Sequence, residues 1–401
     1  MKTIENLKNT ELVKMLLGRA GAVKNAPATA VAQLDTYPAN HMAAQLHPHA
    51  QFLKVKEIIT HSADFKSFIF EPNAAKGTKH LAWFSAGQYL VIAVNVGGKL
   101  YCRPYSIASS PRDTLAGEIR LSIKRVEGGI VSGYLLDSLK AGDEIIASAP
   151  LGTFTYEPLR DAKHIVGIAG GSGITPFRSL AKAICEGDED CSLTLLYGSR
   201  TMKDAVFAEE FAQMAAENKR IQIVHVLSEE KKKGCESGLI DAALIQKYAP
   251  ADAPYSIFLC GPQAMYDFAD KEIATLGLKR KYVRHELFGE YFHPEKNADY
   301  SGDIGAAYKL RVRIAGKEQT IDCAADTTLL RAMEQAGINA PSDCRSGRCG
   351  WCHAQLLSGE VYIPASVDGR RAADKEFGYI HPCCAFPLSD IVLDVPPVPY
   401  G

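Results

Sequence analysis

The sequence predicts a multidomain α+β and α/β chain with three folded parts. From about residue 52 to 158, short β-branched and aromatic runs alternate with turn residues, which is typical of a small antiparallel barrel. From about 163 to 288, apolar strands alternate with a glycine loop and helices, which indicates an open α/β domain with parallel strands. Near the C-terminus, cysteines spaced C-x4-C-x2-C…C predict a small domain that holds a metal cluster.

Whole-chain properties exclude several classes of protein. The 401 residues allow two to four domains, and 45 Lys+Arg against 46 Asp+Glu give no reason to expect nucleic acid as a partner. No apolar run reaches the roughly 18–20 residues of a membrane span. Eleven cysteines in a chain of this length favour free thiols in a reducing cytoplasm over a disulfide scaffold. We therefore expect a cytoplasmic protein without a membrane span.

The cysteine run determines the most specific prediction. Cys344, Cys349 and Cys352 follow the plant-type [2Fe–2S] spacing, and either Cys383 or Cys384 can supply the fourth thiolate. Glycines within the run let the backbone wrap closely around a bulky group. The alternative is a zinc site, but such sites usually add a second closely spaced cysteine pair, which the run lacks.

Residues 1–50 are expected to form an N-terminal helical extension and linker. Apolar residues between Ile4 and Leu17 fall at roughly helical spacing, and a stretch rich in alanine and proline follows. A docking arm for a partner protein is the alternative.

Two runs in the predicted barrel, residues 51–158, suggest a ligand site. Arg103 and Tyr105 lie on one side of an extended segment, so a guanidinium and an aromatic ring face the same ligand. A glycine turn at residues 128–129 opens a helix-like stretch whose first N–H groups suit a phosphate. Each run alone is also compatible with an ordinary barrel strand or a capped helix.

The predicted α/β domain, residues 159–288, carries a glycine loop and a later cysteine motif. The loop GGSGITP, residues 170–176, lets backbone N–H groups approach a pyrophosphate. Cys260-Gly261-Pro262 follows a later strand, and Cys260 can alternatively be a buried structural thiol. At another strand end, Ser199 and Arg200 stand where an acidic residue would accept bonds from a free ribose 2′-OH, which slightly favours NADPH over NADH.

Residues 289–306 are punctuated by glycine and proline and predict a linker. In residues 307–401, runs at 308–314 and 318–323 predict a hairpin, and 327–337 predicts a helix capped by Asp326 or Thr327.

Taken together, the motifs from about residue 52 onward resemble one family. RPYS at 103–106 and GGIVS at 128–132 are similar to signatures of the ferredoxin–NADP reductase superfamily, as is the pairing of GGSGITP with Cys260-Gly-Pro. The C-terminal part resembles a plant-type ferredoxin, whose closing segment selects Cys383 as the fourth ligand. The chain resembles single-chain reductases with flavin, nicotinamide and ferredoxin domains in that order. This implies a flavin-binding β-barrel, a nucleotide-binding α/β domain and a β-grasp ferredoxin domain.

The resemblance also implies roles for individual residues. Tyr105 is expected to stack on the flavin ring, Ser106 to hydrogen-bond flavin N5 and Arg103 to meet the flavin phosphates. The full set of implied cofactor-binding residues is Arg103, Pro104, Tyr105, Ser106, Ser122, Ile123, Lys124, Gly129, Ile130, Val131, Ser132, Gly170, Gly171, Ser172, Gly173, Thr175, Ser199, Arg200, Cys260, Gly261, Pro262 and Phe288. The flavin motifs look more like those of FAD-binding than of FMN-binding members.

The expected function is an NAD(P)H oxidoreductase of the ferredoxin reductase type. Electrons pass from NADH or NADPH through FAD to a [2Fe–2S] cluster held by Cys344, Cys349, Cys352 and Cys383, and then to an external acceptor, a partner metalloenzyme. Ser106 and Cys260 are expected to frame hydride transfer. Glu286 is a candidate proton donor or acceptor. The alternative is that it is an ordinary exposed glutamate.

Three alternatives to that function stay open. The chain can be an electron-relay component of a larger redox complex, it can run in reverse and reduce NAD(P)+, or its acceptor can be a ferric chelate. Arg345 and Arg348 are expected either to form a basic rim for an acidic acceptor or to face inward and compensate the cluster charge.

Overall fold

The computed structural model describes residues 37–286 and 288–397. The chain divides into two compact units, residues 1–47 and 48–401. In the first unit, α2 (Pro38–Leu46) begins with a proline and has no buried residue. Most of the predicted helical extension lies outside the described residues. In the described part of the chain, no helix has the length and apolar character needed to cross a membrane.

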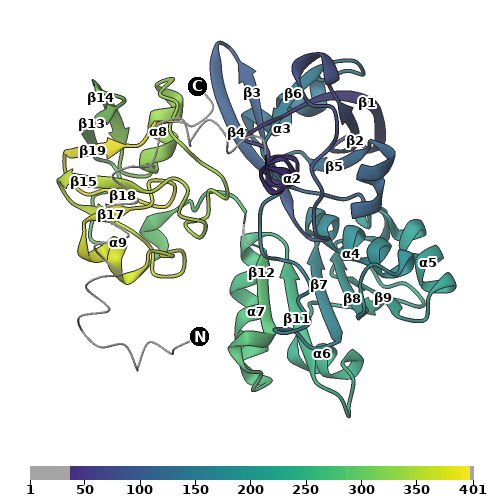
Figure 1. Ribbon diagram of the computed structural model, residues 1–401. Coiled ribbons are helices and arrows are strands. Elements are labelled where there is room, and N and C mark those ends of the chain that lie inside the picture. The colour runs from purple at the N-terminus through teal and green to yellow at the C-terminus, as the bar shows by residue number, and fades with distance from the viewer. Residues whose placement is uncertain (1–36, 287, 398–401) are drawn as a thin grey trace, which may run out of the picture. The chain divides into compact units, whose positions relative to one another are not determined.

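The first domain of the second unit is an antiparallel six-stranded sheet in the order β4-β3-β6-β1-β2-β5 (Figure 1). Alternate residues of β1 point into the core beside Phe68, Phe70 and Leu121. This alternation is expected for an antiparallel sheet with one face on the core and the other in solvent. The elements are β1 (Gln51–Ser62), β2 (Phe65–Pro72), β3 (Tyr89–Val96), β4 (Lys99–Ser106), β5 (Ile119–Lys124), α3 (Ile130–Asp137) and β6 (Glu144–Ala147).

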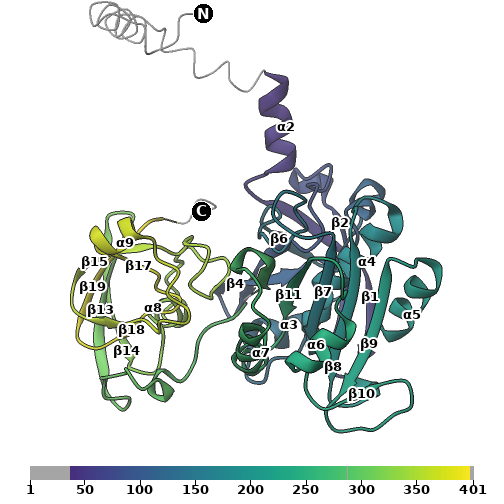
Figure 2. The same ribbon diagram turned by 90° about the horizontal axis from the view of Figure 1, so that it is seen from below.

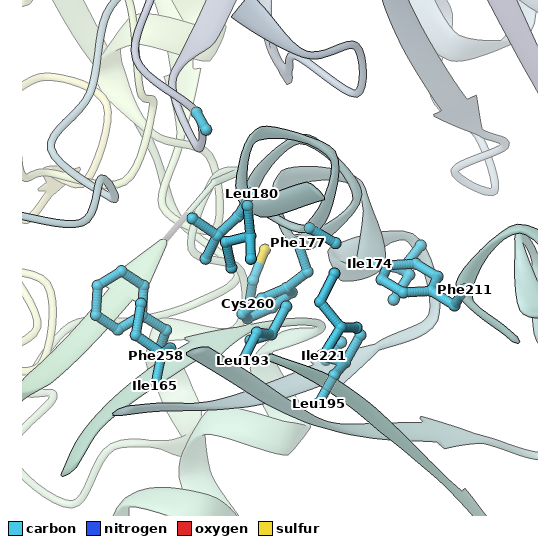
Figure 3. Close-up of a cluster of buried hydrophobic side chains, with 14 of the residues drawn as sticks. Ile165, Ile174, Phe177, Leu180, Leu193, Leu195, Phe211, Ile221, Phe258 and Cys260 are labelled. Atoms are coloured by element: carbon cyan, nitrogen blue, oxygen red, sulfur yellow. The ribbon is translucent and has the colours of Figure 1, made fainter. Parts of the chain in front are cut away.

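The second domain is a parallel sheet in the order β10-β9-β8-β7-β11-β12 with helices on both faces. Leu195 of β8 packs with α4 and α5 in the cluster of Figure 3, whereas its neighbour Leu196 packs with α6 and α7. Both faces of the strands are therefore covered, which explains their continuous apolar runs. The elements are β7 (His164–Gly170), α4 (Thr175–Glu186), β8 (Ser192–Ser199), α5 (Ala208–Glu217), β9 (Ile221–Leu227), β10 (Glu236–Ser237), α6 (Ala242–Tyr248), β11 (Tyr255–Cys260), α7 (Gln263–Thr275) and β12 (Val283–Glu286).

The third domain packs a helix against a mixed sheet in the order β14-β13-β19-β15-β17, with a separate β16-β18 pair (Figure 2). β13 pairs antiparallel with β14 and parallel with β19, and α8 contributes Leu329, Leu330 and Met333 to the core. This is the β-grasp arrangement that the resemblance implied. The elements are β13 (Ala307–Ile314), β14 (Lys317–Ala324), α8 (Leu329–Gln335), β15 (Ala354–Ser358), β16 (Val361–Tyr362), α9 (Ala372–Glu376), β17 (Tyr379–Ile380), β18 (Phe386–Pro387) and β19 (Ile391–Val395).

The predicted cap of the helix before the cysteine loop is wrong by one residue. Neither Asp326 nor Thr327 caps α8. Thr328 has extended backbone angles, and its hydroxyl accepts a hydrogen bond from the Arg331 N–H at 3.3 Å. The sequence offered three adjacent residues that commonly cap helices, and backbone angles decide among them.

Candidate functional site

A cavity of about 540 Å³ lies where β4, the start of α3, the loop after β7 and the end of β11 meet. This volume falls within the roughly 300–1,000 Å³ usual for small-molecule sites. Most of the residues implied by the resemblance line it. They are Arg103, Pro104, Tyr105, Ser106, Ser122, Lys124, Gly129, Ile130, Val131, Ser132, Gly170, Gly171, Ser172, Gly173, Thr175, Cys260, Gly261, Pro262, Glu286 and Phe288.

Three expected residues do not line this cavity. Ile123 is fully buried in the core of the first domain, because it occupies the inward-facing position of β5. Ser199 and Arg200 lie at the carboxyl end of β8, where the Arg200 carbonyl accepts a bond from the Glu229 N–H at 2.9 Å. Their assignment to the nucleotide ribose stays a prediction.

The wall formed by β4 suits a flat aromatic ligand. Tyr105 is half-buried against the barrel core, and burial raises the pKa of its phenol, so the ring lines the cavity as a neutral group. Ser106 is buried at the end of the strand and lies opposite Tyr89 in the register with β3. An apolar ring and a hydroxyl on consecutive residues can contact a ring system and one of its heteroatoms.

The start of α3 suits a phosphate. Gly129 is its N-cap, and no side chain there accepts a hydrogen bond from the first helical N–H groups. A Cβ at Gly129 would lie 2.7 Å from the Ser132 hydroxyl oxygen and 3.0 Å from the Val126 carbonyl oxygen, so glycine keeps the backbone turn open. N–H groups at a helix start without a side-chain partner are a ready anion site.

The loop after β7 closes tightly against the end of β11. A Cβ at Gly173 would lie 2.0 Å from the Cys260 carbonyl oxygen, and one at Gly170 would lie 2.6 Å from the Met265 sulfur. The loop glycines are therefore required by packing as well as by access to phosphate. Sequence reasoning missed Met265, whose side chain fills the space beside the loop, because no motif marks that position of α7.

Cys260 and Glu286 lie side by side at the ends of β11 and β12, where they are in register. Cys260 is 4% exposed, belongs to the hydrophobic cluster of Figure 3 and also lines the cavity. Burial raises the pKa of the Cys260 thiol well above its usual value, and the nearby Glu286 carboxyl group adds a smaller rise. The thiol is therefore uncharged at neutral pH. This holds whether Cys260 contacts the nicotinamide, as predicted, or is a structural thiol, as in the alternative.

Glu286 is not an ordinary exposed glutamate. It is 7% exposed, and its Oε2 atom has no hydrogen-bond partner among the described residues. Burial raises the pKa of this carboxyl group well above its usual value, and the nearby Cys344 adds to the rise. Burial thus favours the protonated form of this carboxyl group, which faces the cavity, as a proton donor requires.

Glu286→Gln should change how stability depends on pH. The folded state binds the Glu286 proton more tightly than the unfolded state, whose pKa is about 4.3. Wild-type stability is therefore lost as pH rises above that value towards the folded pKa, at up to about 1.4 kcal/mol per pH unit. Glutamine carries no such proton, so the variant should gain stability relative to wild type between pH 5 and 8. The measurement is the free energy of unfolding of both proteins by chemical denaturation across this pH range. Parallel pH profiles of the two proteins would contradict the prediction.

The cluster loop arranges four thiols as two pairs. Cys344 lies beside Cys349, and Cys352 lies beside Cys383. In the part of the chain that the structure describes, no three His, Cys, Asp or Glu side chains converge as a single metal ion requires. Two pairs match the need of a two-iron cluster, in which each iron takes two protein thiolates.

Backbone N–H groups of the loop point at these sulfurs. Ser346 and Cys349 each donate to the Cys344 sulfur at 3.4 Å, and Gly347 donates to the Cys383 sulfur at 3.3 Å. A Cβ at Gly347, whose φ is +75°, would lie 2.1 Å from the Val367 carbonyl oxygen. The loop thus needs glycine there, and its N–H groups stabilise negative charge on the ligands.

Cys383 and Cys384 do not lie in an extended segment, in which neighbouring thiols would point to opposite sides. Residues 382–384 instead form a turn, the two thiols are close neighbours, and Cys384 donates to the His381 carbonyl at 3.4 Å. The assignment of Cys383 now depends on its pairing with Cys352 and on the Gly347 N–H, and it stays a prediction.

A further side of the cavity comes from residues that the sequence did not assign to a cofactor site. The linker, α8 and the cluster loop supply Glu290, Phe292, Arg331, Glu334, Gln335 and Arg345. Arg345 is 2% exposed, so the expected outward basic rim is wrong for this residue, while Arg348 is exposed. Arg345 is buried because two carboxylates surround its guanidinium group, and sequence spacing gave no sign of either.

Comparison with known proteins agrees with this architecture. Residues 52–156 match the oxidoreductase FAD-binding domain, 168–271 the oxidoreductase NAD-binding domain and 312–388 the 2Fe-2S iron-sulfur cluster binding domain. The solved structure of phthalate dioxygenase reductase has a similar fold, with a TM-score of 0.62 and 24% identity, over 86% of this chain and 98% of that one.

Curated relatives match most of this chain. The ferredoxin reductase component of the 3-ketosteroid-9-alpha-monooxygenase of Mycolicibacterium smegmatis is 30% identical, over 86% of this chain and 97% of the relative. One component of the 1,2-phenylacetyl-CoA epoxidase of Escherichia coli is 29% identical, over 78% of this chain and 88% of the relative. The chain belongs to the family of ferredoxin reductase components that carry FAD-binding, NAD-binding and [2Fe–2S] domains. The resemblance, the fold class, the enzyme class and the three cofactors expected from the motifs are therefore confirmed.

Proposed function

We propose that this reductase delivers electrons from NADH or NADPH to a separate oxygenase. The observation that carries the proposal is that one cavity is bordered by the flavin motif, by the nucleotide loop and by Arg345 of the cluster loop. The relatives named above include components of a monooxygenase and of an epoxidase. In this proposal, the partner binds the compound that is oxidised.

The cofactors supply the redox chemistry, because a flavin takes two electrons from a nicotinamide as hydride and gives them singly to a [2Fe–2S] cluster. The residues of the chain supply position and protons. In this proposal, Tyr105 and Ser106 orient the flavin ring, the start of α3 binds its phosphate, and the loop after β7 binds the nucleotide pyrophosphate. Glu286 holds a proton at the inner end of the cavity.

The electron-relay alternative is less well supported by the geometry. An unused nucleotide site would not need backbone N–H groups that open onto a cavity of the size of a small ligand. Here the glycines of the loop and Cys260 line that cavity.

Anaerobic reduction of the full chain, purified with both cofactors, tests the proposal. NADH or NADPH should bleach the flavin first and the cluster afterwards, and an oxygenase copurified from the native cell should then reoxidise the cluster. The control is the same protein mixed with dithionite, which reduces both centres without a nucleotide. If dithionite reduces the flavin but neither NADH nor NADPH does, the proposal is contradicted.

A groove of about 520 Å³ beside the cluster ligand Cys349 is the proposed acceptor surface. Arg348, Trp351, His353 and Arg371 line it, and Cys349 is itself exposed. The exposed arginines and the aromatic ring at this surface fit a redox protein whose docking face carries carboxylates.

Arg348→Gln should slow oxidation of the reduced cluster by the native acceptor a few-fold at low salt. Exposed charges steer association, and salt screens them over roughly 8–10 Å near physiological ionic strength. The measurement is the second-order rate against salt, with Arg313→Gln on β13 as a control for an exposed arginine outside the groove. Equal and flat salt dependence in wild type and Arg348→Gln would exclude Arg348 from docking.

A further inference from the structure

Four charged side chains from four segments meet beside the cavity. Arg103 of β4 binds Glu334 of α8 through both terminal nitrogens, at 2.7 and 2.9 Å. The same carboxylate accepts two bonds from Arg345 of the cluster loop, each at 3.2 Å. The Arg345 Nε atom donates in turn to Glu290 of the linker at 2.8 Å. Glu334 therefore bridges the flavin motif and the cluster loop.

The network is balanced in charge and largely shielded from water. It contains two arginines and two glutamates, and the side chains of Arg345, Glu290 and Glu334 are 1%, 7% and 9% exposed. Arg103 is 25% exposed. Removing one partner from a buried network leaves an uncompensated charge, so the arrangement holds its members in a well-defined geometry.

The position of Glu334 relates it to both redox sites. Arg103 stands two residues before Tyr105 on the wall where the flavin ring is expected, and Arg345 directly follows the cluster ligand Cys344. A second contact supports the same junction, because the Lys99 ammonium group donates to the Gln335 carbonyl at the end of α8. The flavin strand and the cluster domain are therefore joined through α8.

We propose that Glu334 is a positioning residue for electron transfer between flavin and cluster. The step oxidises the reduced flavin and reduces the cluster, and electron tunnelling slows steeply as the separation of the two centres grows. By binding Arg103 and Arg345 at once, Glu334 fixes that separation without contacting the reacting atoms. The inference depends on the electron path proposed above.

Glu334→Gln in the full chain with both cofactors tests it. Stopped-flow absorbance separates flavin reduction by the nucleotide from the later reduction of the cluster. Flavin reduction should stay within two-fold of wild type, while reduction of the cluster should slow at least ten-fold. Glu334→Asp, which keeps the charge, should recover part of that loss. Glu318→Gln removes an exposed carboxylate of the same domain and should change neither phase.

A structural readout accompanies the kinetics. Hydrogen exchange in residues 289–306 and 344–352 should rise in Glu334→Gln and not in Glu318→Gln, while the visible spectrum of the cluster stays that of wild type. If Glu334→Gln does not retain its cofactors, Glu290→Gln is used in its place. It should likewise slow reduction of the cluster while leaving reduction of the flavin close to wild type.

Unchanged cluster reduction overturns the proposal, and so does an equal slowing of both phases, which would assign Glu334 to the flavin site. A wild-type flavin that neither nucleotide reduces would instead contradict the proposed function.

Discussion

Cys383→Ser should abolish or strongly alter the visible and paramagnetic spectra of the [2Fe–2S] cluster. The Cys383 thiol pairs with Cys352 and accepts the Gly347 N–H, so its loss leaves one iron with a single protein thiolate. We expect the flavin spectrum to remain, because no cysteine of this loop lines the large cavity. Absorbance and electron paramagnetic resonance of the purified variant measure the effect.

Cys384→Ser is the matched control. It changes the neighbouring thiol, which donates to the His381 carbonyl, and it should leave the cluster spectra close to those of wild type. The reverse outcome, with the cluster lost only in Cys384→Ser, would exclude Cys383 as the fourth ligand.

A chain ending at Gly305 should still reduce its flavin with NADH or NADPH but should lose electron delivery to the native acceptor. The retained part contains the flavin motif, the nucleotide loop and Cys260, whereas the [2Fe–2S] domain is removed. Flavin reduction should stay within several-fold of the full chain, and reduction of the acceptor should fall to background. Anaerobic absorbance at the flavin band measures the first, and acceptor reduction measures the second.

Ferricyanide serves as the control acceptor for the shortened chain, because it takes electrons directly from reduced flavins. A shortened chain that binds flavin but cannot be reduced by either nucleotide would show that the predicted domain boundaries are wrong.

The sequence predicted those parts of the site that short motifs specify. The thiol spacing around Cys349 and the glycine loop after β7 are each required by local geometry, since a wrapped backbone or a close approach leaves no space for a side chain. Such requirements are visible in a single segment, which is why the three domains and most cavity-lining residues could be expected.

The rest of the site depends on contacts between distant segments. Glu334 and Arg345 face Arg103, which is 231 residues from Glu334 in the chain, and the sequence contains no pattern that pairs them. The burial of Glu286 likewise follows from how β12 lies beside β11 and not from its neighbours in sequence. The turn at Cys383 was missed because a proline before two cysteines suits either an extended or a turned backbone.

The close approach of Gly173 to the Cys260 carbonyl has a mechanical consequence. With no side chain between them, the loop after β7 and the end of β11 behave as one stiff rim, because neither can shift without the other. Phe288 lines the same cavity and contacts the Tyr89 ring edge-on, with 4.9 Å between ring centroids. A ligand that binds beside this rim therefore has to fit a fixed backbone edge, because the loop and the strand end cannot move apart separately.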